Sequence, residues 1–589
     1  MRARPGPGII RRSSDGGRGM RLLDRIGLVA RIVRWRLTWN RRDLDHRPEG
    51  DLDARFMTAR EAVRLIPDGA CCLSTGMAGN ARCSSLFWAV REGFEREGRP
   101  RDLTWIAVGG QGGRGKAPGT VEEVGVDGLV TRFVSGHVET TKSLLKLAGA
   151  GRCELHVLPQ GEMVLGLDAQ AEGTSEVRST TGVGTFLDPR TGRGSPVTPG
   201  ANENFVRADG DALLYRMPRL DVAVIAAPWA DAAGNVYFHD AAMITENREA
   251  ARAAKANGGR VLVAVGGVIP NDPARISLPR ELVDAVFVDP RAEQTILSPQ
   301  KRFWRLFTPG GDGDDAAAIE RLRFINRFLR LTPVRGPVEC ALGRLGADQF
   351  ARFLAPGACV NIGVGFGEEV CRELYSSALG PDITFTSETG VYGGMPAPGI
   401  YFGAAVNPKR IESSAWMFRH YADHLDATLL GFLEVDSAGH VNVSKRGPAM
   451  TDYVGPGGFP SITNAARHCF FVGTFMQGAR WRVDGGRLAL VEPGRPKFRA
   501  AVDEITFNGR RALEAGKKVW YVTNVGVFRL VEDGLLLERV MPGVDVARDI
   551  LPNSEARIVL PPGGPEVVPA SVVTGEGFRL AWGEGAGRT

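Results

Sequence analysis

One feature constrains the fold of this chain more than any other: an internal repeat. Three segments of the first half recur in the second at nearly the same spacing: Leu65–Gly79 as Phe353–Gly367, Arg101–Gly110 as Pro381–Gly390, and Leu220–Val236 as Leu425–Val441. In each copy, short apolar runs that end in glycine alternate with stretches of helical spacing, which is typical of βαβ units around a parallel sheet. We therefore predict an α/β fold made of two similar open α/β domains.

The repeat also sets the predicted domain boundaries. The stretch Thr308–Ala318 between the two copies is rich in Gly and Asp, as exposed connectors are. Gly182–Asn202 is rich in Gly, Thr and Pro and is predicted to be a long ordered loop inside the first domain. In chain order we expect an Arg-rich N-terminal extension at 1–54, an N-terminal domain at 55–300, a connector at 301–316, a C-terminal domain at 317–579, and a flexible tail at 580–589.

The N-terminal extension combines two patterns. Residues 1–19 are mostly Gly, Pro, Ser and Arg and are predicted to be disordered; Met20 is an alternative start. From Arg21 to Trp39 apolar residues recur at helical spacing with arginines between them, which predicts one amphipathic helix. We expect this helix to pack on the main body or on a partner subunit. The alternatives are a transit-like segment or contact of residues 20–40 with a membrane surface.

The composition is that of a soluble globular enzyme, with 43% hydrophobic and 24% charged residues. No apolar run reaches the roughly eighteen residues that a membrane helix needs. The eight cysteines include no C-x-x-C pair, and the eight histidines show no H-E-x-x-H spacing. We therefore expect neither a metal site nor disulfide bonds, and we expect a cytoplasmic protein.

The net charge of +6 is concentrated at one end of the chain. Residues 1–54 contain thirteen Arg and seven Asp or Glu residues, which accounts for the whole net charge. The rest of the chain is formally neutral and has no basic field of the kind that nucleic-acid binding requires. We expect no nucleic-acid partner.

A single carboxylate marks the second copy of the repeat. In Asp382–Gly394 (DITFTSETGVYGG) an apolar strand is followed by Glu388 and then by three glycines. The first copy has Val108–Gly110 at this place and lacks the carboxylate. Open α/β sheets bind ligands outside the carboxyl ends of their strands. Glu388 is thus either an ordinary strand-end residue in a glycine turn or a functional group, and the divergence of the two copies favours function.

Six motifs follow one another along the chain: LPQG at 158–161, SETGVYGG at 387–394, GIYFGAAVNP at 399–408, DSAGHVNVSKRGP at 436–448, VGPGGFPSI at 454–462 and VTNVGVFRL at 522–530. They occur in the same order in the family I coenzyme A transferases, which the sequence resembles between Thr58 and Pro561, and within that family it resembles the single-chain acetate/3-ketoacid (propionate, short-chain acyl) enzymes. The resemblance implies an active site between the two domains, with Glu388 as covalent nucleophile.

The resemblance also implies roles for further residues. Gln160 and Gly458 would stabilise oxyanions through a side-chain amide and a backbone N–H; by themselves they read as ordinary turn residues. The loop after the repeated strand would approach coenzyme A, and the alternative is a strand–helix turn without a ligand. Lys445 is either a phosphate partner or a solvated charge. The expected coenzyme A contacts are Gly363, Val364, Gly365, Phe366 and Gly367, with Asn407 and Lys445 as second-rank candidates.

The resemblance implies a ping-pong reaction through a glutamyl-CoA thioester. Its partners would be acyl-CoA and small carboxylic acids, with coenzyme A as a substrate and no permanently bound cofactor, because one thioester is exchanged for another. We expect a homo-oligomer. The alternatives are an acyl-CoA hydrolase on the same fold and, ranked third because Glu388 is present, a non-catalytic CoA-binding regulatory protein.

Overall fold

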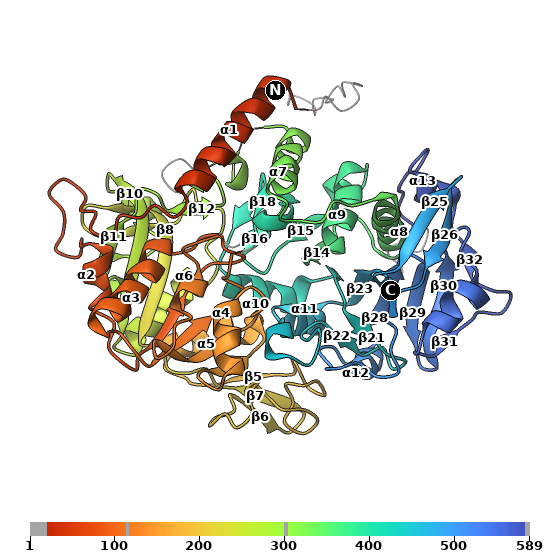
Figure 1. The fold of residues 1–589 in the computed structure, drawn as a ribbon, viewed down its shortest axis with the longest axis horizontal. Coiled ribbons are helices and arrows are strands. Elements are labelled where there is room, and N and C mark those ends of the chain that lie inside the picture. Colours follow the sequence, from red (N-terminus) through yellow and green to blue (C-terminus); the bar gives the residue numbers. More distant parts are fainter. Residues whose placement is uncertain (1–19, 114–116, 300–303, 312, 584–589) are drawn as a thin grey trace, which may run out of the picture.

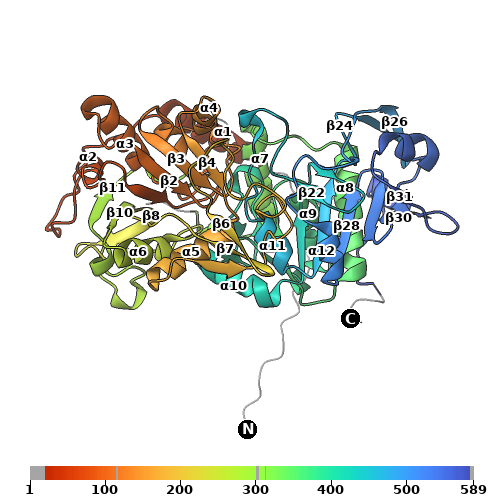
Figure 2. The same cartoon turned by 90° about the horizontal axis from the view of Figure 1, so that it is seen from below.

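Two large sheets dominate the computed structural model, which describes residues 20–113, 117–299, 304–311 and 313–583. They lie side by side, the first drawn from red to yellow-green and the second from green to blue (Figure 1, Figure 2). The predicted disordered segment 1–19 lies outside the described residues, as do residues 584–589 of the predicted tail and residues 301–303 and 312 of the predicted connector.

The first sheet is parallel along its main path, in the order β11-β10-β8-β1-β2-β3-β4. The short β9 (Val236–Tyr237) adds to it antiparallel, beside β8. Its strands are β1 (Cys71–Ser74), β2 (Leu103–Ala107), β3 (Val130–Ser135), β4 (Glu154–Val157), β8 (Val222–Asp231), β10 (Arg260–Ile269) and β11 (Ala285–Val288).

Helices cover both faces of this sheet because successive strand residues point to opposite sides. Cys72 belongs to one core with α2, α3 and α4, whereas Cys71 and Leu73 belong to another with α5 and α6. Thr58 caps the first of these helices through a capping box with Glu61. The helices are α2 (Ala59–Val63), α3 (Ser84–Glu97), α4 (Lys142–Gly149), α5 (Gln160–Ala171) and α6 (Asn247–Ala256).

The second sheet runs in the order β19-β16-β15-β14-β20-β23-β28-β29-β30-β31 and is parallel from β15 to β28. Its strands are β14 (Cys359–Ile362), β15 (Thr384–Thr386), β16 (Val391–Tyr392), β19 (Arg410–Ile411), β20 (Ala427–Leu430), β23 (His468–Gly473), β28 (Lys518–Thr523), β29 (Gly526–Val531), β30 (Gly534–Val540) and β31 (Ile558–Val559). Its helices are α8 (Pro337–Phe353), α9 (Phe366–Ser376) and α13 (Ala570–Thr574) on one face, and α10 (Ser414–His424) and α11 (Phe459–Ala465) on the other.

The repeat seen in the sequence is preserved as strand register. Cys71 pairs with Thr104 in the first sheet, and the equivalent Cys359 pairs with Thr384 in the second. On the other side Cys72 pairs with Val222, and the equivalent Val360 pairs with Ala427. The predicted α/β fold with two similar open sheets is therefore confirmed.

A shared apolar core joins the two halves. Helix α5 of the first half packs against α10 and α11 of the second. Met163 and Val164 of α5 lie in the same buried cluster as Phe418 of α10 and Ile462 of α11. This packing brings the N-terminal end of α5 close to the start of α11.

The N-terminal helix α1 (Leu22–Thr38) forms over the predicted segment. It shares a buried cluster with α7 (Asp315–Leu329) and rises beside it away from the two sheets (Figure 1). Trp304 and Phe307, inside the expected connector, are also buried in this cluster. In the described part of the chain, no helix has both the length and the apolar character needed to cross a membrane.

Short elements complete the fold. Gly182–Asn202 forms turns without helix or strand, as predicted for a long loop. The remaining elements are β5 (Val177–Ser179), β6 (Val206–Asp209), β7 (Ala212–Tyr215), β12 (Glu293–Thr295), β13 (Ser298–Pro299), β17 (Met395–Pro396), β18 (Ala405–Val406), β21 (Glu434–Val435), β22 (Val441–Asn442), β24 (Met476–Gln477), β25 (Arg480–Asp484), β26 (Arg487–Glu492), β27 (Arg495–Pro496), β32 (Glu566–Val567) and α12 (Gly509–Glu514).

Candidate active site

Glu388 lies at the tip of a tight turn that leaves the carboxyl end of β15 and returns as β16. The backbone N–H of Ser387 donates to the Val391 carbonyl at 3.0 Å, and that of Gly390 donates to the Ser387 carbonyl at 3.1 Å. Gly390 has a φ of +96°, and a Cβ there would stand 1.9 Å from the Glu412 carbonyl oxygen. Only glycine fits this position, so the turn that presents Glu388 depends on it.

The Glu388 carboxyl group is almost fully removed from solvent, with 7% of the residue exposed. Burial raises its pKa above the ordinary glutamate value, while hydrogen bonds from Asn361 and Ser387 act in the opposite direction. Ser387 Oγ lies 3.3 Å from Glu388 Oε2. A carboxylate that is poorly solvated in this way is a stronger nucleophile than one in water.

Asn361, whose side chain is hydrogen-bonded to Glu388, belongs to a chain of buried polar side chains. Asn361 Nδ2 donates to the Tyr421 hydroxyl at 3.0 Å, and that hydroxyl donates to Thr386 Oγ1 at 3.0 Å. All three side chains are fully or almost fully buried. These hydrogen bonds fix the orientation of Asn361, and Asn361 in turn helps to fix the carboxyl group of Glu388.

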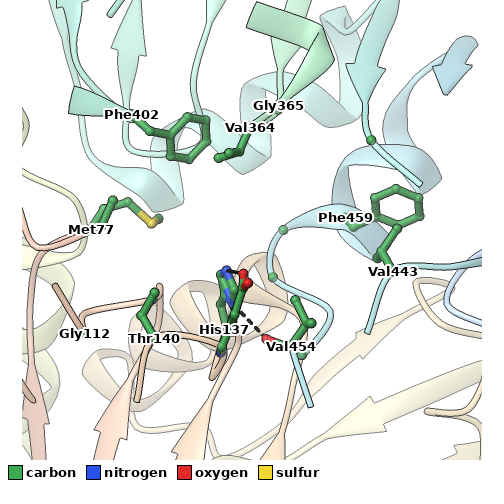
Figure 3. A pocket seen from close by; sticks show the side chains of 18 of the residues that line it. Met77, Gly112, His137, Thr140, Val364, Gly365, Phe402, Val443, Val454 and Phe459 are labelled. Carbon is green, nitrogen blue, oxygen red and sulfur yellow. Dashed lines mark hydrogen bonds and ion pairs between the residues drawn. The ribbon is translucent and has the colours of Figure 1, made fainter. Parts of the chain in front are cut away.

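Glu388 lines a cavity of about 1180 Å³ between the two halves of the chain. Met77, His137 and Thr140 come from the first half, and Val364 and Phe402 face them from the second (Figure 3). Gln160, Gly363, Gly365, Asn361 and Gly458 belong to the same lining. The structure thus brings the three residues expected to be catalytic to one cavity.

Gln160 and Gly458 are in direct contact. Gln160 is the first residue of α5, and its backbone N–H donates to the Gly457 carbonyl at 3.0 Å. Its side-chain Nε2 lies 3.8 Å from Met77 Sδ, a weak acceptor, so its N–H groups remain available to a stronger one. The buried Gln160 Oε1 has no hydrogen-bond partner among the described residues.

The loop after β14 contributes to the cavity lining as far as Gly365, and the residues after it belong to α9. Gly363, Val364 and Gly365 line the cavity. Phe366 and Gly367 begin α9 and lie outside the lining. Phe366 packs under the Arg335 guanidinium, whose Cζ lies 4.3 Å from the centre of the Phe366 ring. A Cβ on Gly367 would stand 2.6 Å from the Leu429 carbonyl oxygen, so this glycine permits close helix–strand packing.

The two second-rank residues also lie outside the cavity lining. Asn407 has a φ of +49° and donates through Nδ2 to Asp315, at the start of α7, so it secures a backbone turn. The backbone N–H of Lys445 donates to Asn442 Oδ1 at 3.1 Å. Its neighbour Arg446 lines the cavity instead.

Sequence reasoning missed several residues at the cavity. His137 follows the carboxyl end of β3, and its Nδ1–H donates to the Val454 carbonyl at 2.7 Å (Figure 3). Arg446 of the second half forms an ion pair with Glu139 of the first at 2.5 Å. The strand-end rule applied to Ser135 would have found His137, whereas nothing in the motif separates Arg446 from Lys445. Among the described residues no group of three or more His, Cys, Asp or Glu side chains is arranged to hold a metal ion.

Comparisons with known proteins agree with this arrangement. Residues 56–289 match the family described as coenzyme A transferase. A caffeate CoA-transferase of Acetobacterium woodii is 31% identical over 508 residues, which cover 85% of this chain and 93% of that protein. Acetate CoA-transferase YdiF of Escherichia coli (strain K12) is 32% identical over 519 residues, which cover 86% of this chain and 93% of that protein.

The fold is similar to that of solved relatives as well. Crystal structures of the acyl-CoA transferase YdiF of Escherichia coli O157:H7, as the apoenzyme and as a thioester complex with CoA, have TM-scores of 0.78 and 0.79 and 28% identity to this chain. The matches cover 91% of this chain and 99% and 100% of those chains. Similarity of this extent over nearly the whole length of the relatives shows that the chain belongs to the coenzyme A transferase family.

Proposed function

We propose that this CoA-transferase moves coenzyme A from an acyl-CoA to a free short-chain or 3-keto carboxylic acid through a thioester on Glu388. One observation carries the proposal: the buried Glu388 carboxyl group lines the same cavity as Gln160 and Gly458. The YdiF structure described as a thioester complex with CoA supports a covalent intermediate of this kind.

The reaction balances without an added cofactor. The Glu388 carboxylate attacks the thioester carbonyl of the acyl-CoA, and the CoA thiolate leaves as a mixed anhydride forms. The thiolate then attacks the glutamyl carbonyl, which releases the first acid and leaves a glutamyl-CoA thioester. The carboxylate of the second acid reverses these steps and departs as the new acyl-CoA. Because thioester is exchanged for thioester, neither ATP nor a metal ion is needed.

Each addition step places negative charge on a carbonyl oxygen, which needs hydrogen-bond donors. We assign this role to the Gln160 side-chain amide and the Gly458 backbone N–H, whose contact across the halves supports a common binding point. The Gly363–Gly365 loop, which lines the cavity beside Glu388, is assigned to the pantetheine or phosphate part of coenzyme A.

The setting of the enzyme is also part of the proposal. We divide the chain into the extension 1–54, domains 55–300 and 317–579 with a connector at 301–316, and the tail 580–589. The free thiols of all eight cysteines are compatible with a reducing cytoplasm. We further propose a homo-oligomer that acts on small acids. The two named relatives are a caffeate CoA-transferase and an acetate CoA-transferase, and these two acids differ widely in size.

Steady-state kinetics with a panel of acyl-CoA donors and carboxylic acids test this function. We expect parallel double-reciprocal plots, as for a ping-pong reaction, formation of the new acyl-CoA when an acid acceptor is present, and little free CoA whether or not the acid is present. Free CoA that accumulates as fast as the acyl-CoA is consumed, with or without an acid, would contradict transfer and identify a hydrolase. The Glu388→Gln variant should lose both activities, whereas Glu246→Gln should retain them.

Glu246 is a matched control because it is also buried but does not line the cavity. Burial raises its pKa to about 8, so the neutral acid predominates at pH 7 and glutamine reproduces its shape and charge.

A further inference from the structure

Helix α1 carries two separate apolar stripes, and only one of them faces the protein. Leu28 and Ile32 are buried against the body, 5% and 1% exposed. Trp35 follows on the same side and donates through Nε1 to Glu293 Oε1 at 2.6 Å. These contacts hold the helix in a fixed orientation on the enzyme.

The second stripe faces solvent. Leu22, Ile26, the half-buried Val29, Val33 and Leu37 follow one another at intervals of three or four residues, which places their side chains on one face of the helix. It begins at the outer end of α1, which stands away from the sheets (Figure 1). Its large side chains are Leu22, Leu23, Ile26, Val33 and Leu37, with exposures of 72%, 81%, 56%, 45% and 76%.

Arginines border the exposed stripe on both sides. On the helical wheel Arg25 and Arg36 lie along one edge of the stripe, and Arg34 lies along the other. All three are exposed, and Asp24 is the only acidic residue of the helix. An apolar face bordered by arginines is the pattern of a helix that lies in the interface of a membrane with anionic lipids.

We propose that the exposed stripe of α1, Leu22 to Leu37, docks the enzyme onto an anionic lipid surface. The apolar side chains would enter the headgroup boundary, and the flanking arginines would pair with lipid phosphates. The charge favours lipid over the same helix of a second copy, because two such faces would bring the flanking arginines of both copies together. The helix also lies outside residues 56–289, the segment that matches the family.

Sedimentation of the full-length protein with vesicles tests this assignment. We expect binding to vesicles of phosphatidylcholine with phosphatidylglycerol, binding at least tenfold weaker to pure phosphatidylcholine, and a decrease as salt is raised. The triple variant Ile26→Ser/Val33→Ser/Leu37→Ser should bind at least tenfold more weakly than the wild type. Transferase activity should be unchanged in solution, because none of these residues lines the cavity.

A double variant of remote exposed residues, Val491→Ser/Val567→Ser, serves as the matched control, since these valines are 56% and 62% exposed at the other end of the chain. It should bind anionic vesicles as the wild type does. Arg25→Gln/Arg34→Gln should weaken binding and flatten its salt dependence. The proposal would be overturned if the wild type stayed in solution or if the triple variant bound vesicles as the wild type does. It would also be overturned if the only change in the triple variant were a smaller oligomer by light scattering, which would assign the stripe to a second copy.

Discussion

The side-chain oxygen of Gln160 lies so close to Gly458 that a Cβ on residue 458 would stand 2.9 Å from it. Gln160 begins α5 and Gly458 immediately precedes α11, and these two helices come from different halves of the chain. The hydrogen bond from the Gln160 backbone N–H to the Gly457 carbonyl fixes the same contact. The proposed oxyanion site therefore exists only when the two halves are packed together.

Substitution of Gly458 by alanine should disturb catalysis more than folding. Its φ of −80° suits any residue, so the added methyl group acts by crowding: it would stand 2.9 Å from the Gln160 side-chain oxygen and 3.0 Å from Ile462 Cδ1. We expect kcat to fall by as much as about 10²-fold with a smaller change in KM, as for the loss of an oxyanion donor. Steady-state kinetics with one acyl-CoA and one acid measure the effect.

Gly166→Ala is the matched control for this variant. Gly166 lies in α5, the helix of Gln160, and a Cβ there would make only ordinary contact, 3.4 Å from Met217 Cγ. Activity of Gly166→Ala should equal that of the wild type. A Gly458→Ala enzyme within twofold of the wild-type kcat would show that the contact with Gln160 has no catalytic role.

Gly390→Ala should damage the turn that carries Glu388. The substitution combines a left-handed φ of +96° with a Cβ 1.9 Å from the Glu412 carbonyl oxygen. Gly357→Ala, at a φ of +93° with no atom within 4 Å of its Cβ, isolates the backbone strain of about 1–2 kcal/mol. Chemical denaturation should show a larger loss of unfolding free energy for Gly390→Ala, together with a loss of activity that Gly357→Ala does not share.

Glu388→Gln should stabilise the folded enzyme at neutral pH. Because the folded-state pKa is raised, the unfolded chain loses its proton near the ordinary value of 4.5 while the folded protein keeps it. The stability from this group is complete below that value and is lost as pH rises toward the folded-state pKa, by about 1.4 kcal/mol per pKa unit. Thermal unfolding midpoints of the variant should exceed those of the wild type at pH 7 and approach them as pH falls to 4.5. A midpoint below that of the wild type at pH 7 would contradict a raised pKa.

Ser461→Ala should loosen the contact between the halves. Ser461 Oγ donates to Glu162 Oε2 at 2.6 Å and accepts from the Gly161 backbone N–H at 3.2 Å. Its removal leaves buried polar groups with fewer partners, which costs about 1–3 kcal/mol. Both the unfolding free energy and kcat should fall. Thr463→Ala, whose hydroxyl bonds only within α11, should leave kcat unchanged; equal kcat losses in both variants would point to the helix rather than to the contact.

The repeat made the fold predictable. Equivalent residues such as Cys71 and Cys359 occupy equivalent strand registers, so a sequence comparison within the chain was enough to place β1, β2, β14 and β15. The position of Glu388 at a strand end followed from the same alignment. These predictions succeeded because each depends on the pattern of residues within a short segment of the chain.

Features that depend on distant partners were not predictable. Asn407 lies outside the cavity lining, and its side chain binds Asp315, more than ninety residues earlier in the chain. Whether Lys445 or Arg446 lines the cavity depends on the turn that starts at Asn442. Helical spacing predicted α1, yet it did not reveal which of its two apolar stripes faces the body.

Mass analysis of the covalent intermediate tests the central claim most directly. The enzyme is incubated with an acyl-CoA in the absence of an acceptor acid and digested, and its peptides are searched for a thioester-linked CoA. We predict one adduct, on the peptide that contains Glu388, that disappears when a carboxylic acid is added and is absent from Glu388→Gln. An adduct on another residue, or full transferase activity in Glu388→Gln, would contradict the account.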